Sequence, residues 1–344
     1  EAHADEIMGL YERVLRRRRV VDVREAALPG PWRITFDTNP DTCNLSCVMC
    51  EGFSGLREDD GAGSGGARVG SSRVMDFDLI RRVVAAGRDR GLREIIPSTM
   101  GEPLLYERFE DIVGLCGEYD VKLNLTTNGT FPGRGAEGWG ELILPVASDV
   151  KISWNGATKE TQEAVMVGSP WEKRLADLRT FVALRDELVG QGKSSATLTL
   201  QVTFMEKNLA ELVGIVELAI ELGIDRVKGH HVWCHYPWLR DEQYMRRDGD
   251  AVSRWNDAVA AVRELADRRR LPNGDAIRLE NFFELTVDGS GNEDVRFGGQ
   301  CPFLGREAWI SASGEFSPCC APDELRRGLG SFGNLYEKSL DEIW

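Results

Sequence analysis

Residues 32–50, WRITFDTNPDTCNLSCVMC, contain the pattern that decides the fold. The first seven, 32–38, follow the Pro-Gly-Pro of residues 29–31 and predict a strand that the chain enters through a turn. Cys43, Cys47 and Cys50 follow with the spacing Cx3Cx2C. Because they come directly after a strand, we expect all three on a loop at its carboxyl end.

From this strand to about residue 271, predicted strands and helices alternate. Further strands are expected at 93–100, 121–128, 149–155, 196–204 and 225–234, with helices at 76–90, 105–119, 139–146, 158–166, 171–191, 208–222 and 248–269. Such alternation predicts βα units with right-handed crossovers and a parallel sheet. Six units predict an α/β fold, a partial (β/α)6 TIM-like barrel, with functional side chains at the carboxyl ends of the strands.

Three divisions of the chain are expected. Residues 1–31 read as a helical extension, residues 32–271 as the barrel, and residues 272–344 as a small α+β domain, because short strand-like pieces replace the alternation there. Residues 55–74 are rich in glycine and polar side chains and predict a long loop.

Composition narrows the class of protein. The 344 residues include 56 acidic and 42 basic side chains, a net charge of −14, which argues against nucleic-acid binding. The acidity suits a neutral or cationic small substrate, or solubility alone. No apolar run is long enough for a membrane span, and the charged N-terminal stretch does not resemble a signal peptide. We therefore expect a cytoplasmic protein that binds neither nucleic acid nor membrane.

The eight cysteines predict metal or redox chemistry rather than a disulfide framework, as is typical of a cytoplasmic protein. Three thiolates on a [4Fe–4S] cubane leave one iron open, and an open coordination position serves chemistry rather than structure. A structural zinc site needs a fourth Cys or His nearby, but Glu51, Gly52 and Phe53 follow the third cysteine. The spacing therefore favours an iron–sulfur cluster over zinc.

With its Cx3Cx2C motif at a strand end and its partial barrel, the sequence resembles the radical S-adenosylmethionine (SAM) superfamily. The resemblance implies that the open iron binds SAM and that one-electron reduction yields a 5′-deoxyadenosyl radical, which takes hydrogen from a substrate. It also implies an electron donor such as flavodoxin or ferredoxin.

The resemblance extends to SAM contacts near the cysteines and at other strand ends: Met49, Met100, Gly101, Glu102, Thr127, Asn128, Ser153 and Asn155. Met100-Gly101-Glu102 is similar to the Gly-Gly-Glu segment that binds the SAM ammonium, with Met in place of the first glycine. Met49 stands where the family usually carries an aromatic residue. Taken alone, Glu102 also suits a helix start and Thr127-Asn128 a turn.

A second group of cysteines lies near the C-terminus. Cys301, Gly314 and Cys319 have the spacing Cx12Gx4C, and Cys320 follows at once. This pattern resembles the opening of the SPASM or twitch module, which implies a second, auxiliary iron–sulfur cluster with these three cysteines as ligands. In the family a CxxC pair follows, whereas the printed sequence ends at Trp344, so we expect an incomplete ligand set. The alternative is three buried thiols without metal.

The sixth strand carries candidates for substrate chemistry. Alternation puts Lys228, His230, Val232 and Cys234 on one face and His231, Trp233 and His235 on the other, and the sequence does not decide which face points inward. Cys234 has three interpretations: a hydrogen-atom donor, a remote ligand of the second cluster, or a buried thiol. Glu206 and Lys151 suit acid–base work or an ion pair, and Cys116 suits the core.

These features predict a radical SAM oxidoreductase or epimerase. We expect dehydrogenation or epimerisation of a small polar substrate, an aminoglycoside- or sugar-like intermediate of natural-product biosynthesis, because residues 1–30 are too short for a leader-peptide-binding domain. A maturase that modifies a ribosomal peptide is the first alternative. A non-catalytic iron–sulfur or zinc protein is the alternative from another class.

Overall fold

The computed structural model describes residues 30–55, 73–286, 301, 303–319, 326 and 328–344. Two predictions, the helical extension at 1–31 and the loop at 55–74, lie almost wholly outside these described residues.

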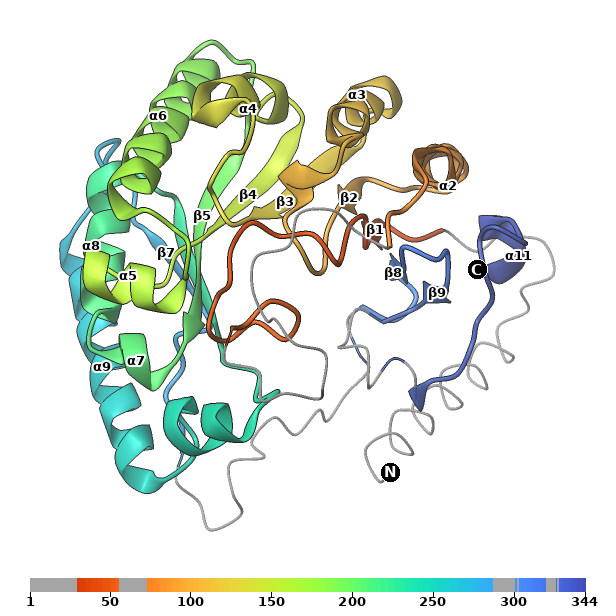
Figure 1. Ribbon diagram of the computed structural model, residues 1–344. Helices are drawn as coiled ribbons and strands as arrows, with labels where there is room; N and C mark the ends of the chain where they lie inside the picture. Colours follow the sequence, from red (N-terminus) through yellow and green to blue (C-terminus); the bar gives the residue numbers. More distant parts are fainter. Residues whose placement is uncertain (1–29, 56–72, 287–300, 302, 320–325, 327) are drawn as a thin grey trace.

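The described strands form one sheet in the order β7-β6-β5-β4-β3-β2-β1-β8-β9. All neighbouring pairs are parallel except β8 and β9. Figure 1 shows the sheet curving into an arc that does not close, which confirms the partial barrel. The strands are β1 (Arg33–Phe36), β2 (Glu94–Ile96), β3 (Lys122–Thr127), β4 (Ala147–Ser153), β5 (Thr197–Phe204), β6 (Arg226–His231), β7 (Arg278–Glu280), β8 (Glu307–Ile310) and β9 (Phe316–Ser317).

The larger helices lie outside this arc (Figure 1). The described helices are α2 (Phe77–Asp89), η1 (Pro103–Leu105), α3 (Phe109–Tyr119), α4 (Gly135–Ile143), α5 (Lys159–Val165), α6 (Trp171–Gly190), α7 (Glu206–Leu209), α8 (Leu212–Leu222), η2 (Leu239–Gln243), α9 (Gly249–Arg268) and α11 (Leu340–Ile343). Asp76 and Asp248 cap the N-termini of α2 and α9, and Gly223 ends α8 in the left-handed conformation.

The main hydrophobic core lies between the sheet and these helices. Strand residues such as Ile34, Leu125 and Ile152 are almost fully buried there, together with Phe181 of α6 and Trp255 of α9. Cys116 is buried in α3, as its sequence context predicts. Since successive strand residues point to opposite faces, the intervening residues line the concave face of the arc.

The structure adds detail to the expected elements in two places. The expected helix at 208–222 is two helices, α7 and α8. The expected boundary at 272 falls before β7, which pairs with β6 and extends the barrel sheet, and β8 pairs with β1. Neither strand was predicted as part of the barrel, because each is only three or four residues long and its partners are distant in sequence.

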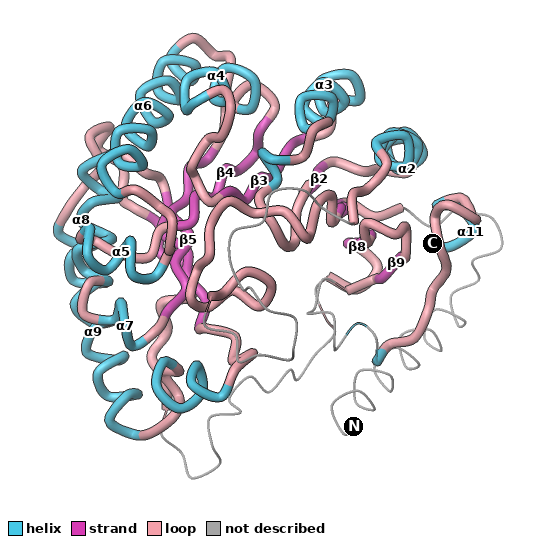
Figure 2. Tube along the Cα trace, in the orientation of Figure 1, coloured by secondary structure: helices cyan, strands magenta, loops and turns pink. Residues whose placement is uncertain are grey.

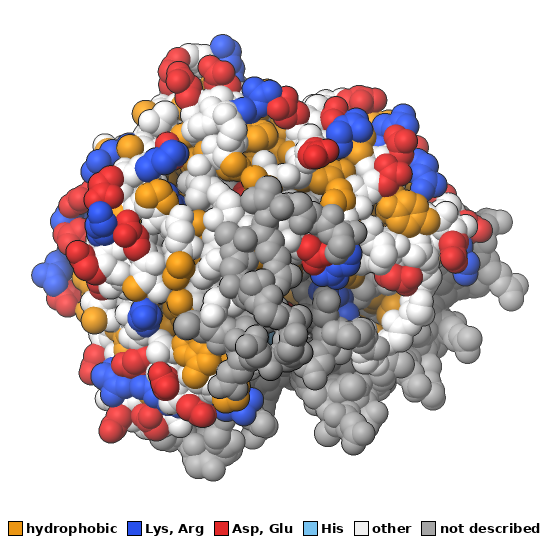
Figure 3. Space-filling model, viewed as in Figure 1, with side chains coloured by type: hydrophobic (Ala, Val, Ile, Leu, Met, Phe, Trp, Pro, Cys, Tyr) orange, Lys and Arg blue, Asp and Glu red, His pale blue; other side chains and the backbone are white. Residues whose placement is uncertain are grey.

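Acidic and basic side chains are interspersed over the face of the molecule that Figure 3 shows. Within the described part of the chain, no helix is long and apolar enough to span a bilayer.

Candidate active site around the cysteine loop

The cysteine loop, residues 43–54, runs inside the arc of strands (Figure 2). At its start, Asn128 of the β3 end lies against Cys43, with Nδ2 3.9 Å from Sγ. The same Nδ2 donates to Oδ1 of Asn44 at 2.8 Å, and Asn44 in turn donates to Thr130. The structure thus brings the predicted residue Asn128 to the first cysteine.

Backbone hydrogen bonds hold the middle of the loop. The N–H of Ser46 donates to the carbonyl of Val167 at 2.9 Å, and that of Val48 to Val165 at 3.0 Å. These bonds flank Cys47.

The side chains of the loop also contribute to a second apolar core. Its buried members are Leu45, Val48, Val165, Met166, Met205, Val232 and Leu239. Partly buried side chains pack against it: Cys43, Cys47, Met49, Cys234, Tyr236, Trp238 and Tyr244.

Gly101 joins the predicted Met-Gly-Glu segment to the chain that enters this loop. Its φ is +76°, and a Cβ here would lie 2.4 Å from the carbonyl oxygen of Asn39 and 2.7 Å from that of Thr42. Only glycine allows this conformation and this approach. The N–H of Glu102 donates to the same Thr42 carbonyl at 2.8 Å, so two segments 60 residues apart in sequence are fixed together.

Glu102 is 1% exposed, and its carboxylate is already bonded by the protein. Thr127 donates to Oε1 at 2.7 Å, and the N–H of Asn128 donates to Oε2 at 2.6 Å. Burial raises the pKa of Glu102 to about 7, although these hydrogen bonds act in the opposite direction. The carboxylate therefore organises the end of β3, and its contact with SAM stays a prediction.

Ser153 and Asn155 lie at the end of β4, as predicted. Asn155 is buried, and its Oδ1 accepts from the N–H of Thr203 at 2.8 Å, which ties β4 to β5. The backbone carbonyl of Ser153 accepts from Arg174 at 2.7 Å. Their roles toward SAM also stay predictions.

Arg174 of α6 was missed from the sequence. It is 1% exposed, donates to Ser169 at 2.8 Å and stacks 4.9 Å from the ring of Trp154. Its Nε is buried and has no hydrogen-bond partner. Burial lowers its pKa to about 10, which Cys47 and Glu102 partly offset by their charges. A buried cation with a spare donor beside the cysteine loop fits a ligand that carries a carboxylate, as SAM does.

The three thiols lie close enough to affect one another's ionisation. Burial raises the pKa of Cys43 to about 12 and that of Cys47 further, so a cation is needed to hold them as thiolates. Yet nowhere in the described ranges do three metal-binding side chains converge on one ion. A cubane separates its ligands, because each thiolate binds a different iron.

The structure decides which face of β6 points inward. The ring of His231 packs 4.7 Å from Trp255 of α9, on the helix side of the sheet. Lys228 and His230 therefore face the concave side, where Lys228 Nζ lies 3.2 Å from Glu280 of β7. The His230 side chain is exposed on this face, and the protein atoms packed around its ring, together with the charge of Lys228, lower its pKa.

The other candidates for substrate chemistry are placed differently. Glu206 pairs with Arg247 at 2.6 Å and Arg254 at 3.0 Å, which keep its pKa low despite the opposing effect of burial and favour the ion-pair interpretation. Lys151 lies on the inner face beside Asp149. Cys234 packs against the second apolar core, near the cysteine loop, and burial raises its pKa.

Two of the C-terminal cysteines, Cys301 and Cys319, are described and partly buried, and Cys319 donates its N–H to Ser317. The third, Cys320, lies outside the described residues.

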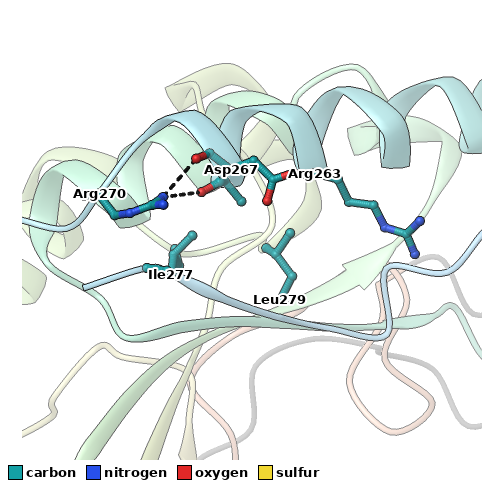
Figure 4. A pocket seen from close by; sticks show the side chains of 7 residues that line it. Arg263, Asp267, Arg270, Ile277 and Leu279 are labelled. Carbon is teal, nitrogen blue, oxygen red and sulfur yellow. Dashed lines mark hydrogen bonds between the residues drawn. The ribbon is translucent and has the colours of Figure 1, made fainter. Parts of the chain in front are cut away.

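A hollow of about 300 Å³ lies on the outer side of the sheet, between α9 and the segment that contains β7. Arg270 donates there to two backbone carbonyls at the end of α9 (Figure 4). Its lining includes none of the predicted site residues, so we assign it no part in the chemistry.

Fold and site together define an iron–sulfur enzyme of the open-barrel type. The sequence model of the radical SAM superfamily matches residues 15–189, half of the chain, and the chain belongs to this superfamily. A model described as SPASM, an iron–sulfur cluster-binding domain, matches residues 301–344.

Individual relatives agree with this assignment. A Pyrococcus furiosus protein, named tungsten-containing aldehyde ferredoxin oxidoreductase cofactor-modifying protein, is 25% identical over 325 residues, 88% of this chain and 78% of that protein. Streptococcus suis SuiB bound to precursor peptide SuiA matches with a TM-score of 0.61 at 15% identity over 92% of this chain, which spans 65% of the SuiB chain. Native anSMEcpe with bound AdoMet matches with a TM-score of 0.60 at 15% identity, covering 91% of this chain and 80% of that one.

Membership makes the chain an enzyme that uses SAM and a [4Fe–4S] cluster, and the SPASM match implies auxiliary iron–sulfur clusters. This membership argues against the alternative of a non-catalytic metal protein. Enzymes of this family act on small molecules or peptides and take electrons from an external donor.

Proposed function

We propose that this enzyme abstracts hydrogen from a small polar substrate held on the concave face of the barrel, and that the substrate leaves dehydrogenated or epimerised. The observation that carries the proposal is the chemistry of that face. Apart from the second apolar core around the cysteine loop, the strand side chains on this face are mostly charged or hydroxylated, so it suits a substrate with many hydrogen-bonding groups.

A continuous polar belt crosses the inner face. Its members, in order from β8 to β7, are Glu307, Arg33, Glu94, Asn124, Lys151, Asp149, Thr199, Arg226, Glu280 and Lys228. Four of these side chains are acidic and four are basic, so the belt is neutral overall. A neutral surface rich in donors and acceptors favours a polyhydroxylated or amino-substituted ligand over a strongly charged one.

Lys228 and Glu280 of the belt, and His230 beside them, remain exposed on the concave face. The side chains of Lys228 and Glu280 are 37% and 38% exposed, although they form an ion pair. His230 carries a lowered pKa and is neutral near pH 7, so it offers one donor and one acceptor. We assign the ion pair to orienting substrate hydroxyl or amino groups and His230 to holding or moving a proton.

A [4Fe–4S] cluster bound at the cysteine loop would supply the one-electron chemistry that this family performs on SAM. Cys43, Cys47 and Cys50 hold that cluster in this proposal, and Arg174 and Glu102 organise the SAM side of the site. Cys301, Cys319 and Cys320 are assigned to an auxiliary cluster.

The test of radical chemistry is formation of 5′-deoxyadenosine from SAM by the reduced, anaerobically reconstituted protein. We expect Cys43→Ala, Cys47→Ala and Cys50→Ala each to abolish it. Cys116→Ala is the matched control, since this buried thiol lies in the helix core, and it should retain turnover. Retained turnover in all three loop variants would refute the assignment of the cluster.

Product mass then separates the two outcomes. Loss of two hydrogens marks dehydrogenation, whereas epimerisation leaves the mass unchanged in H2O and raises it by about one mass unit when the reaction is run in D2O. If Cys234 is the hydrogen donor, Cys234→Ala should eliminate that deuterium while leaving SAM cleavage intact. An unchanged product would exclude this role for Cys234.

A peptide substrate is the second candidate. It is favoured by the likeness of the fold to SuiB bound to a precursor peptide and to anSMEcpe bound to a peptide. The two substrate classes can be distinguished by adding low-molecular-weight cell extract, either untreated or digested with protease, to the reduced enzyme and SAM. Stimulation of 5′-deoxyadenosine formation that survives protease supports the small substrate, and stimulation that protease removes supports the peptide.

A further inference from the structure

The connection between β6 and α9, residues 232–248, reaches from the inner face of the barrel to the cysteine loop. Val232 and Leu239 are buried in the second apolar core beside Leu45 and Val48 of that loop. None of the sequence motifs covers this connection apart from Cys234. Its position nevertheless puts it in direct contact with the residues that hold the cluster.

Tyr236 makes a hydrogen bond between the two segments, and Nδ1 of its neighbour His235 lies 3.8 Å from the carboxylate of Glu51. The tyrosine hydroxyl donates to the backbone carbonyl of Glu51 at 2.6 Å, and the carbonyl of Cys50 lies 3.3 Å from the same oxygen. Cys50 also donates its N–H to Cys47 at 3.0 Å, which closes the turn between the second and third cysteines. The phenol therefore holds the backbone on the C-terminal side of this turn.

Each cysteine consequently has an anchor of a different kind. Cys43 is held by the amide of Asn128, and Cys47 by the backbone bonds of its two neighbours to the chain between α5 and α6. On the Cys50 side, the hydroxyl of Tyr236 reaches the loop backbone from the β6–α9 connection, and within the loop the N–H of Ser54 donates to the Cys50 carbonyl at 3.3 Å. Loss of the hydroxyl should therefore loosen the third ligand and leave the other two in place.

The connection is itself fixed at its far end. The N–H of Lys207 donates to the side chain of Gln243 at 3.0 Å, and Arg247 pairs with Glu206 at 2.6 Å. The ion pair at Glu206 thus has a clear structural effect, since it ties this connection to the end of β5. Tyr236 projects from a backbone that is held on both sides of it.

We propose that Tyr236 is a positioning residue for the SAM-binding iron–sulfur cluster, which acts through the carbonyls of Cys50 and Glu51. The hydroxyl fixes the Cys50 thiolate relative to the other two ligands. It also offsets the negative ends of two carbonyl dipoles beside the cluster. This role concerns the cluster rather than the substrate, so it holds whichever substrate the enzyme uses.

The electrostatic consequence has a definite sign. One-electron reduction adds negative charge to the cluster, and a backbone carbonyl oxygen that loses a hydrogen-bond donor opposes that charge more strongly. Removing the hydroxyl should therefore move the midpoint potential of the cluster to a more negative value. Loosening of the Cys50 ligand should also weaken SAM binding, because SAM and the thiolates share the same cluster.

The test compares Tyr236→Phe with Tyr244→Phe in the full-length, anaerobically reconstituted protein. Tyr244 packs against the same apolar core from the same connection, and no hydrogen bond of its hydroxyl to a described residue is found. The readouts are iron content, the potential at which the SAM-responsive EPR signal appears, and the SAM concentration that half-saturates its change.

For Tyr236→Phe we expect a more negative potential and several-fold weaker SAM binding, with the thermal midpoint unchanged. Selective loss of iron from this variant would support the proposal too. Tyr244→Phe should match the wild type in every readout. A Tyr236→Phe protein with wild-type potential, EPR spectrum and SAM affinity would overturn the proposal, as would equal changes in the two variants.

Discussion

Glu102 is the residue on which the strand-end motifs converge. Its backbone is bonded to Thr42 before the first cysteine, and its carboxylate to the side chain of Thr127 and the N–H of Asn128. These contacts enclose the carboxyl group in protein, and this burial raises the pKa of Glu102 from 4.5 to about 7.

This shift makes the stability of the apoprotein depend on pH. Between pH 4.5 and about 7 the folded state keeps a proton on Glu102 that the unfolded state releases. The free energy of unfolding should therefore fall as pH rises through this window, by up to about 3 kcal/mol. Glu102→Gln cannot titrate and should flatten that part of the profile, measured by urea unfolding at a series of pH values.

Glu211 provides the control for this profile. Burial acts to raise its pKa, but hydrogen bonds from Thr161 and Thr158 outweigh that effect and lower it. Its contribution is therefore present above its unfolded pKa and is lost as pH falls, so Glu211→Gln should alter only the acidic end. A Glu102→Gln profile that still slopes like the wild type between pH 4.5 and 7 would contradict the assignment.

A single site residue could be predicted from the sequence only where it belongs to a recognisable local motif. Cys43, Cys47 and Cys50 have a spacing that few other sites share, and Gly101 belongs to a recognisable segment. Arg174 does not, because it lies in WEKRLADLR, which reads as the charged face of a surface helix. Tyr236 lies in an irregular connection, and only the three-dimensional path of the chain brings it to the cysteine loop.

At the scale of elements, hydrophobic alternation located the six βα units to within a few residues, because each strand buries one face against its own helix. The same pattern could not orient β6. Both of its faces carry histidine, and only the packing of α9 on the sheet decides which one is the core face. Long-range pairing, which local sequence does not record, likewise places β7 and β8.

The two neighbouring histidines of β6 should respond oppositely to substitution. His231 packs between Phe204 and Trp255, so His231→Ala should lower the free energy of unfolding by about 2 kcal/mol and leave SAM cleavage unchanged. His230→Ala removes an exposed side chain and should lower the free energy of unfolding by less than about 1 kcal/mol. It should reduce product formed per 5′-deoxyadenosine. Urea unfolding measures the stability of the two variants, and a product assay coupled to 5′-deoxyadenosine formation measures their activity. A large loss of stability in His230→Ala and a loss of product in His231→Ala would show that β6 faces the other way.

At the scale of the whole molecule, the polar belt joins all eight parallel strands. It begins at Glu307 of β8, which pairs with Arg33 of β1 at 2.8 Å, and it ends at the pair of Lys228 and Glu280. The C-terminal strand β8 is thus part of the same ionic network as the barrel. Since the belt is neutral, the chain's net charge of −14 comes from residues outside it. That charge therefore causes no repulsion within the belt.

Asp149 is the centre of this belt, and its removal tests how strongly the network holds the sheet. It pairs with Arg226 and Lys151, accepts from Thr199 at 2.9 Å, and its side chain is 12% exposed. Asp149→Ala leaves Lys151 without its carboxylate partner and Arg226 with Glu280 alone, and it should lower the free energy of unfolding by about 3–5 kcal/mol.

The surface pair of Glu217 and Arg269 gives the comparison, since both side chains are 45% exposed at a separation of 3.0 Å. Glu217→Ala should change the free energy by no more than about 0.5 kcal/mol, because water screens such pairs. Denaturant unfolding with unchanged m-values measures both variants. If Asp149→Ala lowers the free energy of unfolding as little as Glu217→Ala does, the belt lines the concave face without holding the strands together. The stability of the open sheet would then come from its outer apolar core alone.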